Sequence, residues 1–519
     1  MQRRHPPGRH RTTPNGRKER QTMGNKSVVI AVVLGLGAVL ALLRLGGREL
    51  PAQAAPTAPA AELHVCPSGC TYSSVQAAVD AAQEGDLIKV AQGTYTDVHH
   101  IASLDTSTFT ATQIVAITKS LTIQGGYTTT NWTTPDPEAH PTILDAQGSG
   151  RVMVISGPIT PTVEGLRFTG GDATGLGGTP WGDGGGGVYV VTATATLERL
   201  TIVSNTALYG GGLYLNQSGT RILSSTIQAN RQNAGGGGGL YLYYSNGAVV
   251  AGTSITGNRA GNGGGMFLLW CNGVLIEENV IVANEGGYEG GGIRLGTSTA
   301  TLRGNLISGN QASYGGGISF FAYGQQPALE GNRIVSNTAG VRGGGLYFNY
   351  LSPARLVNNV IADNQAPQGS ALYVRDSSPV LLHTTIARNG GGPGVVVASE
   401  SIYFDSRVAM TNTILFSHTV GITVAAGNTV TLNATLWQAN GTDRGGAGTI
   451  SHSGDSSGDP AFAADGYHLT SGSAALNRGV DAGVTTDIDG DRRPSGSGYD
   501  LGADEMAFPV YLPLVMRNR

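Results

Sequence analysis

Charged residues are scarce in this sequence. Asp, Glu, Lys and Arg make up 13% of its 519 residues, far less than in a coiled coil or a charged disordered tail. Residues 1–54 hold ten of the 32 basic side chains and two of the 35 acidic ones, so the rest holds 22 basic and 33 acidic groups, a net charge of about −11. Such a surface repels phosphate, and no basic stripe interleaved with aromatic residues offsets the repulsion. We therefore expect no nucleic-acid partner.

Cysteine is scarce as well, with three residues and no spacing that resembles a zinc site. Cys66 and Cys70, in CPSGC, are close enough to form a disulfide that would pin the chain after its leader, which indicates an oxidising compartment. Cys271 follows Trp270, and we expect it to be a small buried hydrophobic residue rather than a nucleophile.

Long apolar runs are absent apart from residues 27–43, SVVIAVVLGLGAVLALL. Basic residues precede this run and small residues follow it, which is typical of a secretory signal cleaved near Ala54 or Ala55. Its length of about 17 residues is also near the minimum for a membrane-spanning helix, so a retained anchor is the alternative. Either interpretation predicts an extracellular or cell-surface protein. If the signal is cleaved, no membrane span is left in the mature chain.

Glycine, in contrast, is abundant. There are 81 glycines, more than twice the usual share of about 7%. They cluster instead of recurring at every third residue, which excludes collagen. Because glycine is unfavourable inside regular elements and favourable in tight turns, the content predicts a fold with very many turns.

Two sequence patterns repeat in phase. The first is Ile-x-x-Asn, and the second is a glycine cluster followed by alternating residues, as in GGLYL at 211 and 238 and GGMFL at 264. Successive Ile-x-x-Asn motifs lie 25 to 28 residues apart. Two patterns that keep one period indicate a repeat architecture. The asparagines that end the first pattern are Asn205, Asn230, Asn258, Asn284, Asn310, Asn337, Asn364 and Asn389.

The composition of each unit selects among repeat folds. Helical solenoids need long runs of helix formers, and leucine-rich repeats need leucines at fixed offsets, and both are missing. The units fit one turn of a parallel β-helix, in which each strand lies about 4.8 Å from its counterpart in the next turn. We predict an all-β solenoid of about twelve turns over residues 71–458, after a linker at 55–70. An N-terminal lid helix at 75–82 and a cap at 459–505 would close its two ends, because open strand edges recruit other chains.

The stacked columns divide into three kinds. Alternate residues after the glycines should point inward and form the core, and the asparagines should bond from turn to turn. Between the inward residues lies a column of rings that we expect on an exposed face, with a break at Arg294 and Ser319. Such rings either stack on sugars or only stabilise the strands. The rings are Tyr189, Tyr214, Tyr241, Phe267, Tyr347 and Tyr373.

These motifs carry a family resemblance. The glycine cluster with its apolar pair, alternating with Ile-x-x-Asn, resembles the repeats of polymorphic outer-membrane proteins and of right-handed parallel β-helix proteins related to pectate lyases. Residues 72–97, with Gly93, Thr94 and Tyr95 at a turn, look like the first helix and strand of that superfamily. Residues 459–505 are similar to the C-terminal cap of secreted bacterial β-helix proteins, and 506–519 to apolar tails of exported proteins. The resemblance implies a right-handed β-helix and leaves function open.

Few residues are candidates for a catalytic site. The catalytic motifs of polygalacturonase-like hydrolases and pectin methylesterase-like enzymes are absent. The nearest approach to a lyase site is Arg375, Asp376, Asp405 and Arg407, for which charged, solvated turns are the alternative.

Asp487, Asp489 and Asp491, in DIDGD, have the spacing of a calcium loop without its terminal glutamate, so either a weak Ca²⁺ site or a structural turn is possible. We expect no other cofactor.

Together these features predict a secreted or surface-held monomer without catalytic activity. It would serve in surface structure or adhesion or bind glycans, with extracellular polysaccharide or cell-surface components as its partners. The alternative is a polysaccharide lyase or glycoside hydrolase.

Overall fold

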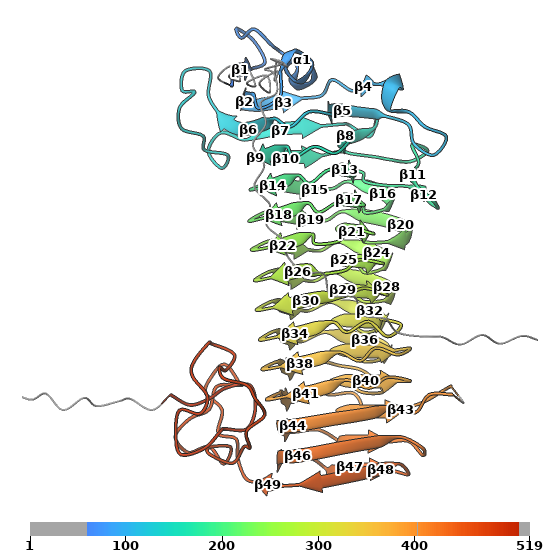
Figure 1. Cartoon of the computed structure of the whole chain (residues 1–519), viewed down its shortest axis with the longest axis vertical. Helices are drawn as coiled ribbons and strands as arrows, with labels where there is room; N and C mark the ends of the chain where they lie inside the picture. Colours follow the sequence, from blue (N-terminus) through green and yellow to red (C-terminus); the bar gives the residue numbers. More distant parts are fainter. Residues whose placement is uncertain (1–59, 402, 508–519) are drawn as a thin grey trace, which may run out of the picture. The chain divides into compact units, whose positions relative to one another are not determined.

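The computed structural model describes residues 60–401 and 403–507. The leader, the signal or anchor and most of the apolar tail at 506–519 lie outside these ranges. Strands stack turn upon turn as a parallel β-solenoid (Figure 1). The solenoid has about 15 turns instead of the expected dozen, because the first turns, through β2 (Leu87–Ala91), β6 (Thr122–Tyr127) and β9 (Thr162–Glu164), carry long loops and none of the repeating motifs.

A short helix covers the first turn, as predicted. Helix α1 (Val75–Ala81) is capped by Ser74, whose side chain accepts a hydrogen bond from the Ala77 N–H. Its apolar face joins the core. Gln76 is buried and pairs with the strand edge below, because its side-chain oxygen accepts from the Ala116 N–H at 2.7 Å and its NH₂ donates to the Ala116 carbonyl at 3.4 Å. An amide side chain thus satisfies a strand edge at a residue that no neighbouring strand of the described ranges pairs on that side. Cys66 and Cys70 form a disulfide just before the helix.

One wall of the solenoid is a sheet of 14 strands. All neighbours are parallel except the first pair. The strands in spatial order are β4 (His99–His100), β5 (Thr112–Ile117), β8 (Arg151–Ser156), β13 (Val188–Val191), β17 (Leu213–Asn216), β21 (Leu240–Tyr243), β25 (Met266–Leu269), β29 (Ile293–Gly296), β33 (Ile318–Phe321), β37 (Leu346–Asn349), β40 (Leu372–Arg375), β43 (Val395–Ala398), β45 (Val420–Val424) and β47 (Thr442–Gly446).

The remaining walls form a sheet of 27 strands, in which most turns contribute two strands separated by a bend. One file holds β1 (Glu62–Val65), β2, β6, β9, β14 (Thr196–Glu198), β18 (Arg221–Leu223), β22 (Val249–Ala251), β26 (Val274–Glu277), β30 (Ala300–Arg303), β34 (Ala328–Glu330), β38 (Arg355–Val357) and β41 (Val380–Leu382). The other holds β3 (Gly93–Tyr95), β7 (Thr142–Asp145), β10 (Leu166–Thr169), β15 (Thr201–Val203), β19 (Thr226–Gln228), β23 (Ser254–Thr256), β27 (Val280–Val282), β31 (Leu306–Ser308), β35 (Arg333–Val335), β39 (Val360–Ala362) and β42 (Thr385–Ala387). The files merge in β44 (Arg407–Phe416) and β46 (Thr429–Gln438), followed by β48 (Thr449–Ser453) and β49 (Ser456–Ser457).

A third, six-stranded sheet precedes the glycine clusters and was not predicted. Its strands carry no apolar alternation. They are β16 (Thr206–Tyr209), β20 (Arg231–Gly236), β24 (Arg259–Asn262), β28 (Glu285–Glu289), β32 (Gln311–Tyr314) and β36 (Thr338–Arg342). A separate two-stranded hairpin, β11 (Gly178–Thr179) and β12 (Gly182–Asp183), lies beside its first turn.

The predicted columns are present in the interior. Leu213 pairs in register with Leu240, and Leu240 with Met266, and all three are fully buried. The asparagine column bonds from turn to turn as expected: Asn258 Nδ2 and its backbone N–H both donate to Asn284 Oδ1 at 3.0 Å. These ladders satisfy backbone groups where the strands bend, so the asparagines are structural.

The glycine clusters fill the space between this ladder and the next turn. A Cβ on Gly212 would lie 2.5 Å from the Gly239 carbonyl oxygen and 3.0 Å from the Asn230 amide nitrogen. Any larger residue at this position would push neighbouring turns apart.

The C-terminal segment 459–505 does not close the end of the solenoid. It folds back and lies beside β38 to β46 (Figure 1). Asn358 Nδ2 donates to the Thr486 carbonyl at 2.7 Å, and Asn412 Nδ2 donates to the Val480 carbonyl at 2.7 Å. The segment covers apolar residues such as Val360 and Ala387 on the outer face of the solenoid. Burying that face stabilises the segment more than capping the polar last turn would, because β48 offers few apolar side chains.

Candidate functional site

The predicted ring column is buried, so the expectation of an exposed face was wrong. Tyr214 is 0% and Tyr241 1% exposed, and the other four rings, Tyr189, Phe267, Tyr347 and Tyr373, are at most 6% exposed. Glycine backbone lies directly on them: a Cβ on Gly236 would meet the Phe267 ring at 2.2 Å. Burial raises the pKa of Tyr214 and Tyr241 far above the ordinary value. In this position the rings stabilise the strands and cannot stack on a sugar.

Exposed rings lie instead where the chain bends after the 14-stranded sheet. The residue at this bend adopts a positive φ in turn after turn, including Tyr244, Trp270, Tyr323 and Tyr350 at 48° to 55°. Such backbone is unusual for bulky residues. It recurs here because each turn stacks on the same bend, and it places rings at the corner of the solenoid.

Ring cluster 1 consists of Trp181, Tyr209, Tyr243, Tyr244 and Trp270. Trp181 comes from the hairpin β11–β12, and its ring centre lies 5.1 Å from that of Tyr243 and 6.1 Å from that of Trp270. Tyr244 stacks on Trp270 at 5.2 Å. Trp181 and Tyr244 are 44% and 43% exposed. The cluster therefore presents a broad aromatic surface to solvent.

A pocket of about 340 Å³ lies beside ring cluster 1. Trp181 and Tyr209 of the cluster line it together with the polar residues Asn262 and Arg294. Asn262 Oδ1 is buried there without a hydrogen-bond partner among the described residues. Arg294 donates from Nε to Glu289 at 2.7 Å and lies 4.6 Å from the centre of the Phe267 ring. Rings beside a free amide oxygen and a guanidinium group can hold the apolar face and the hydroxyl or carboxylate groups of a sugar.

Ring cluster 2 consists of Phe321, Tyr323, Tyr350, Tyr403 and Phe404. Tyr350 stacks on Phe321 at 5.4 Å and on Tyr323 at 5.5 Å, and its ring centre lies 6.4 Å from that of Phe404. Tyr323 and Tyr403 are 59% and 79% exposed. This cluster occupies the same corner as ring cluster 1, farther along the solenoid.

Three of the four catalytic candidates line one pocket of about 430 Å³ beside ring cluster 2. They are Asp376, Asp405 and Arg407. Asp376 is buried, and its Oδ1 accepts from the backbone N–H groups of residues 400 and 401, both at 3.0 Å, so this carboxylate fixes the local loop. Arg375 does not line the pocket, and it pairs with Glu400 at 2.9 Å. Asp405 and Arg407 are exposed.

The three aspartates of DIDGD do not converge as metal ligands. Asp487 Oδ1 accepts from the N–H groups of Asp489 and Asp491 at 3.0 and 2.8 Å, and its Oδ2 accepts from the Glu505 N–H at 3.0 Å. The first carboxylate of the motif therefore closes a turn. The group of possible metal ligands in the described ranges is His468, Asp489 and Asp504.

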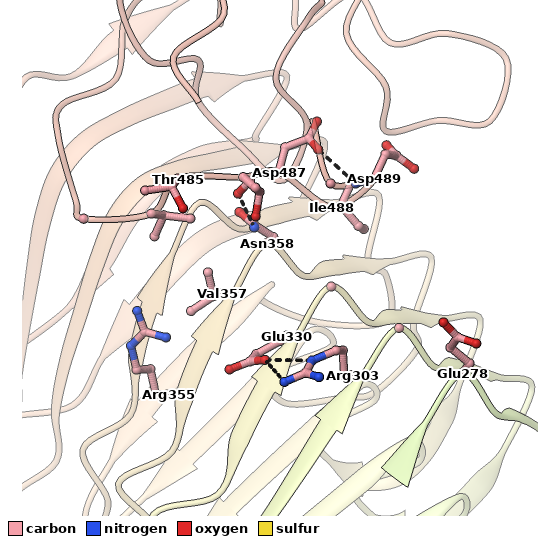
Figure 2. Close-up of a pocket in the computed structure, with 16 residues that line it drawn as sticks. Glu278, Arg303, Glu330, Arg355, Val357, Asn358, Thr485, Asp487, Ile488 and Asp489 are labelled. Atoms are coloured by element: carbon pink, nitrogen blue, oxygen red, sulfur yellow. Dashed lines mark hydrogen bonds and ion pairs between the residues drawn. The ribbon is translucent and has the colours of Figure 1, made fainter. Parts of the chain in front are cut away.

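A larger, charged pocket of about 610 Å³ separates the solenoid from the C-terminal segment (Figure 2). Arg303 lies on the solenoid side, where it bridges Glu277 and Glu330, each at 3.1 Å. Residues 483–490 form the opposite side. Figure 2 shows Asp487 and Asp489 on this side, across from Arg303.

Cys271 is a buried free thiol, as predicted. Burial raises its pKa to about 12, which makes it inert as a nucleophile at neutral pH.

Residues 186–342 and 329–436 match the family model described as a right handed beta helix region. The repeats are turns of a right-handed β-helix. This confirms the fold that the resemblance implied, whereas the likeness to polymorphic outer-membrane repeats stays a prediction. No curated protein matches the chain.

Solved structures that are similar to this chain share 13% sequence identity with it. The periplasmic alginate epimerase AlgG aligns over 71% of this chain and 77% of its own, with a TM-score of 0.42. Pectate lyase Pel9A aligns over 86% and 97%, with a TM-score of 0.32. The catalytic domain of a GH87 alpha-1,3-glucanase, solved with tetrasaccharides, aligns over 78% and 70%, with a TM-score of 0.36. Similarity this low says nothing about the activity of this chain.

None of the helices in residues 60–401 and 403–507 has the length and apolar character that a membrane-spanning segment needs.

The corner rings were missed although the sequence marks them. In four turns they follow the inward pair by two or three residues, as in LYLYYSN at 240, MFLLWCN at 266, ISFFAYG at 318 and LYFNYLS at 346. Aromatic residues recurring at that offset, just beyond the strand, are the signal. The alternation inside the strand instead predicted that the column from Tyr189 to Tyr373, which is buried, would be exposed.

Proposed function

We propose that this protein is exported and binds extracellular polysaccharide along the corner that carries ring clusters 1 and 2. The observation that carries the proposal is the exposed, contiguous aromatic surface of ring cluster 1 beside the unpaired amide oxygen of Asn262 and the guanidinium group of Arg294. Monomeric proteins rarely expose large apolar surfaces without a binding role. Tyr and Trp rings suit sugars because one side chain offers both an apolar face and a polar edge.

The spacing of the two clusters supports a chain-like ligand. Tyr243 is in register with Leu269, then Gly296, then Phe321, so Tyr243 of ring cluster 1 and Phe321 of ring cluster 2 lie three turns apart. At about 4.8 Å per turn this is roughly 14 Å, a span that an oligosaccharide can bridge. The turn between them, at Gly296 and Thr297, carries no ring and leaves the path open.

Export is proposed from the apolar run at residues 27–43 and from the disulfide between Cys66 and Cys70. Disulfides persist in oxidising compartments. The leader itself lies outside the described residues.

The test is binding of the double variant Trp181→Ala, Tyr244→Ala to a panel of neutral and acidic polysaccharides in affinity electrophoresis. We expect at least a tenfold loss of retention on the polysaccharide that binds the unaltered chain. Tyr288→Ala is the matched control, because Tyr288 is 56% exposed and belongs to neither cluster. Equal retention of the double variant and the control would contradict the proposal.

A polysaccharide lyase or hydrolase is the second candidate, favoured by the meeting of Asp376, Asp405 and Arg407 in one pocket. Incubation with the same panel would then release unsaturated or reducing ends. The release would fall strongly in Asp405→Asn, because the exposed Asp405 is the carboxylate of this pocket that does not fix a loop. Binding without release would leave the non-catalytic function standing.

A further inference from the structure

We propose that His468, Asp489 and Asp504 form a binding site for a zinc-like divalent cation that ties the C-terminal segment together. One ligand atom from each residue can be chosen so that all lie within 4.8 Å of one another. His468 Nε2 lies 2.6 Å from Asp489 Oδ2. One imidazole nitrogen and two carboxylate oxygens are a donor set that suits Zn²⁺, with a fourth position left for water.

A residue outside the three ligands, Asp465, orients the His468 ring. The other ring nitrogen of His468, Nδ1, is hydrogen-bonded to Asp465 Oδ2. Asp465 is itself held, because its Oδ1 accepts from the N–H groups of Tyr467 and His468 at 3.1 and 3.2 Å. Histidines that bind metals commonly donate their second nitrogen to a carboxylate in this way, which fixes the tautomer and the orientation of the ring. Nε2 then faces Asp489 Oδ2, and a bound ion would take the place of their direct contact at 2.6 Å.

Asp504 is also held in place by a hydrogen bond, in this case from the backbone. It is 6% exposed, and its Oδ2 accepts from the Leu469 N–H at 2.6 Å, which leaves Oδ1 for a ligand. Three carboxylates, Asp465, Asp489 and Asp504, thus surround one imidazole. A divalent cation would balance this negative charge, whereas a protonated imidazole balances only part of it.

The segment that these ligands join has little regular structure. Within residues 459–505 the backbone is paired by isolated bridges such as Phe462 with Leu469 and Thr486 with Arg492. The three ligands come from separate stretches of it. A metal that links such stretches supplies stability that a small apolar core cannot, and its binding free energy then becomes folding free energy.

The experiment uses the full chain, freed of metal by chelator and titrated with ZnCl₂ in a calorimeter. We expect one zinc per chain, at least tenfold weaker binding in Asp489→Asn, and a raised melting temperature with zinc that Asp489→Asn loses. Asp489 is partly exposed, so this variant should fold. His452→Asn is the matched control, since His452 pairs with Asp455 at 2.9 Å outside any ligand group.

Absence of stoichiometric zinc binding would overturn the proposal. So would zinc binding that His452→Asn weakens as much as Asp489→Asn does, because the ion would then be held by scattered surface groups. Should Asp489→Asn fail to fold, His468→Gln, which removes the imidazole, replaces it with the same expected loss.

Discussion

The asparagine ladder is expected to be a main source of stability, and Asn310→Ala tests it. Asn310 is fully buried. Its Oδ1 accepts from the N–H of Asn284 at 2.9 Å and from Asn284 Nδ2 at 3.0 Å. Its Nδ2 donates to the Ile281 carbonyl and to Asn337 Oδ1, both at 2.9 Å. Alanine removes all four bonds and leaves their partners buried without replacement.

Each such bond contributes about 1 kcal/mol net, and orphaned buried partners cost more, so we expect Asn310→Ala to destabilise the chain by about 4 kcal/mol. The matched control is Asn246→Ala. Asn246 is an exposed asparagine whose Oδ1 accepts one bond, from the Asn272 N–H at 2.7 Å, so its replacement should cost below about 1 kcal/mol.

Urea unfolding followed by circular dichroism measures both variants, and hydrogen exchange provides a local readout. The Asn284 amide loses its acceptor in Asn310→Ala and should exchange much faster, while amides at the first turns are unchanged. If the two variants unfold at the same urea concentration, or if Asn284 exchange is unaltered, the ladder does not have the role assigned to it.

Two further predictions concern buried groups. Tyr214 is fully buried and its hydroxyl has no hydrogen-bond partner among the described residues, so Tyr214→Phe should be neutral or stabilising by up to about 1 kcal/mol, whereas Tyr214→Ala should cost about 3–5 kcal/mol in urea unfolding. A marked loss in Tyr214→Phe would show that the hydroxyl is bonded. His418 is 4% exposed, and burial lowers the pKa of its imidazole to about 4 from the ordinary 6.5. Below pH 6.5 the unfolded chain takes up a proton at this residue that the folded chain does not. The free energy of unfolding therefore falls by about 2 kcal/mol by pH 5. His418→Asn should remove that part of the loss when unfolding is compared between pH 7 and pH 5, and an unchanged pH dependence would refute the assignment.

The sequence predicts the repeat architecture well, for a physical reason. Stacking places like residues over one another, so Leu213 over Leu240 and Asn258 over Asn284 leave periodic marks that alternate with the strand. Period and alternation together determine the core and the ladders.

The candidate site was predicted poorly because its parts carry weaker marks. The six-stranded sheet that buries Tyr214 and Tyr241 consists of short polar and glycine-containing strands such as RAGN at 259, without apolar alternation. Trp181 joins ring cluster 1 from a hairpin outside the repeat. His468 and Asp504 meet through a fold-back with no regular spacing.

Whether sugar binds at the corner of the solenoid is best decided by a crystal structure of the chain with an oligosaccharide from the polysaccharide that it retains best. We predict electron density for sugar rings stacked on Trp181 or Tyr244 and continuing along the corner towards Tyr323 and Tyr350. Sugar bound only elsewhere on the solenoid, with the corner rings free in solvent, would show that these rings are not the binding surface.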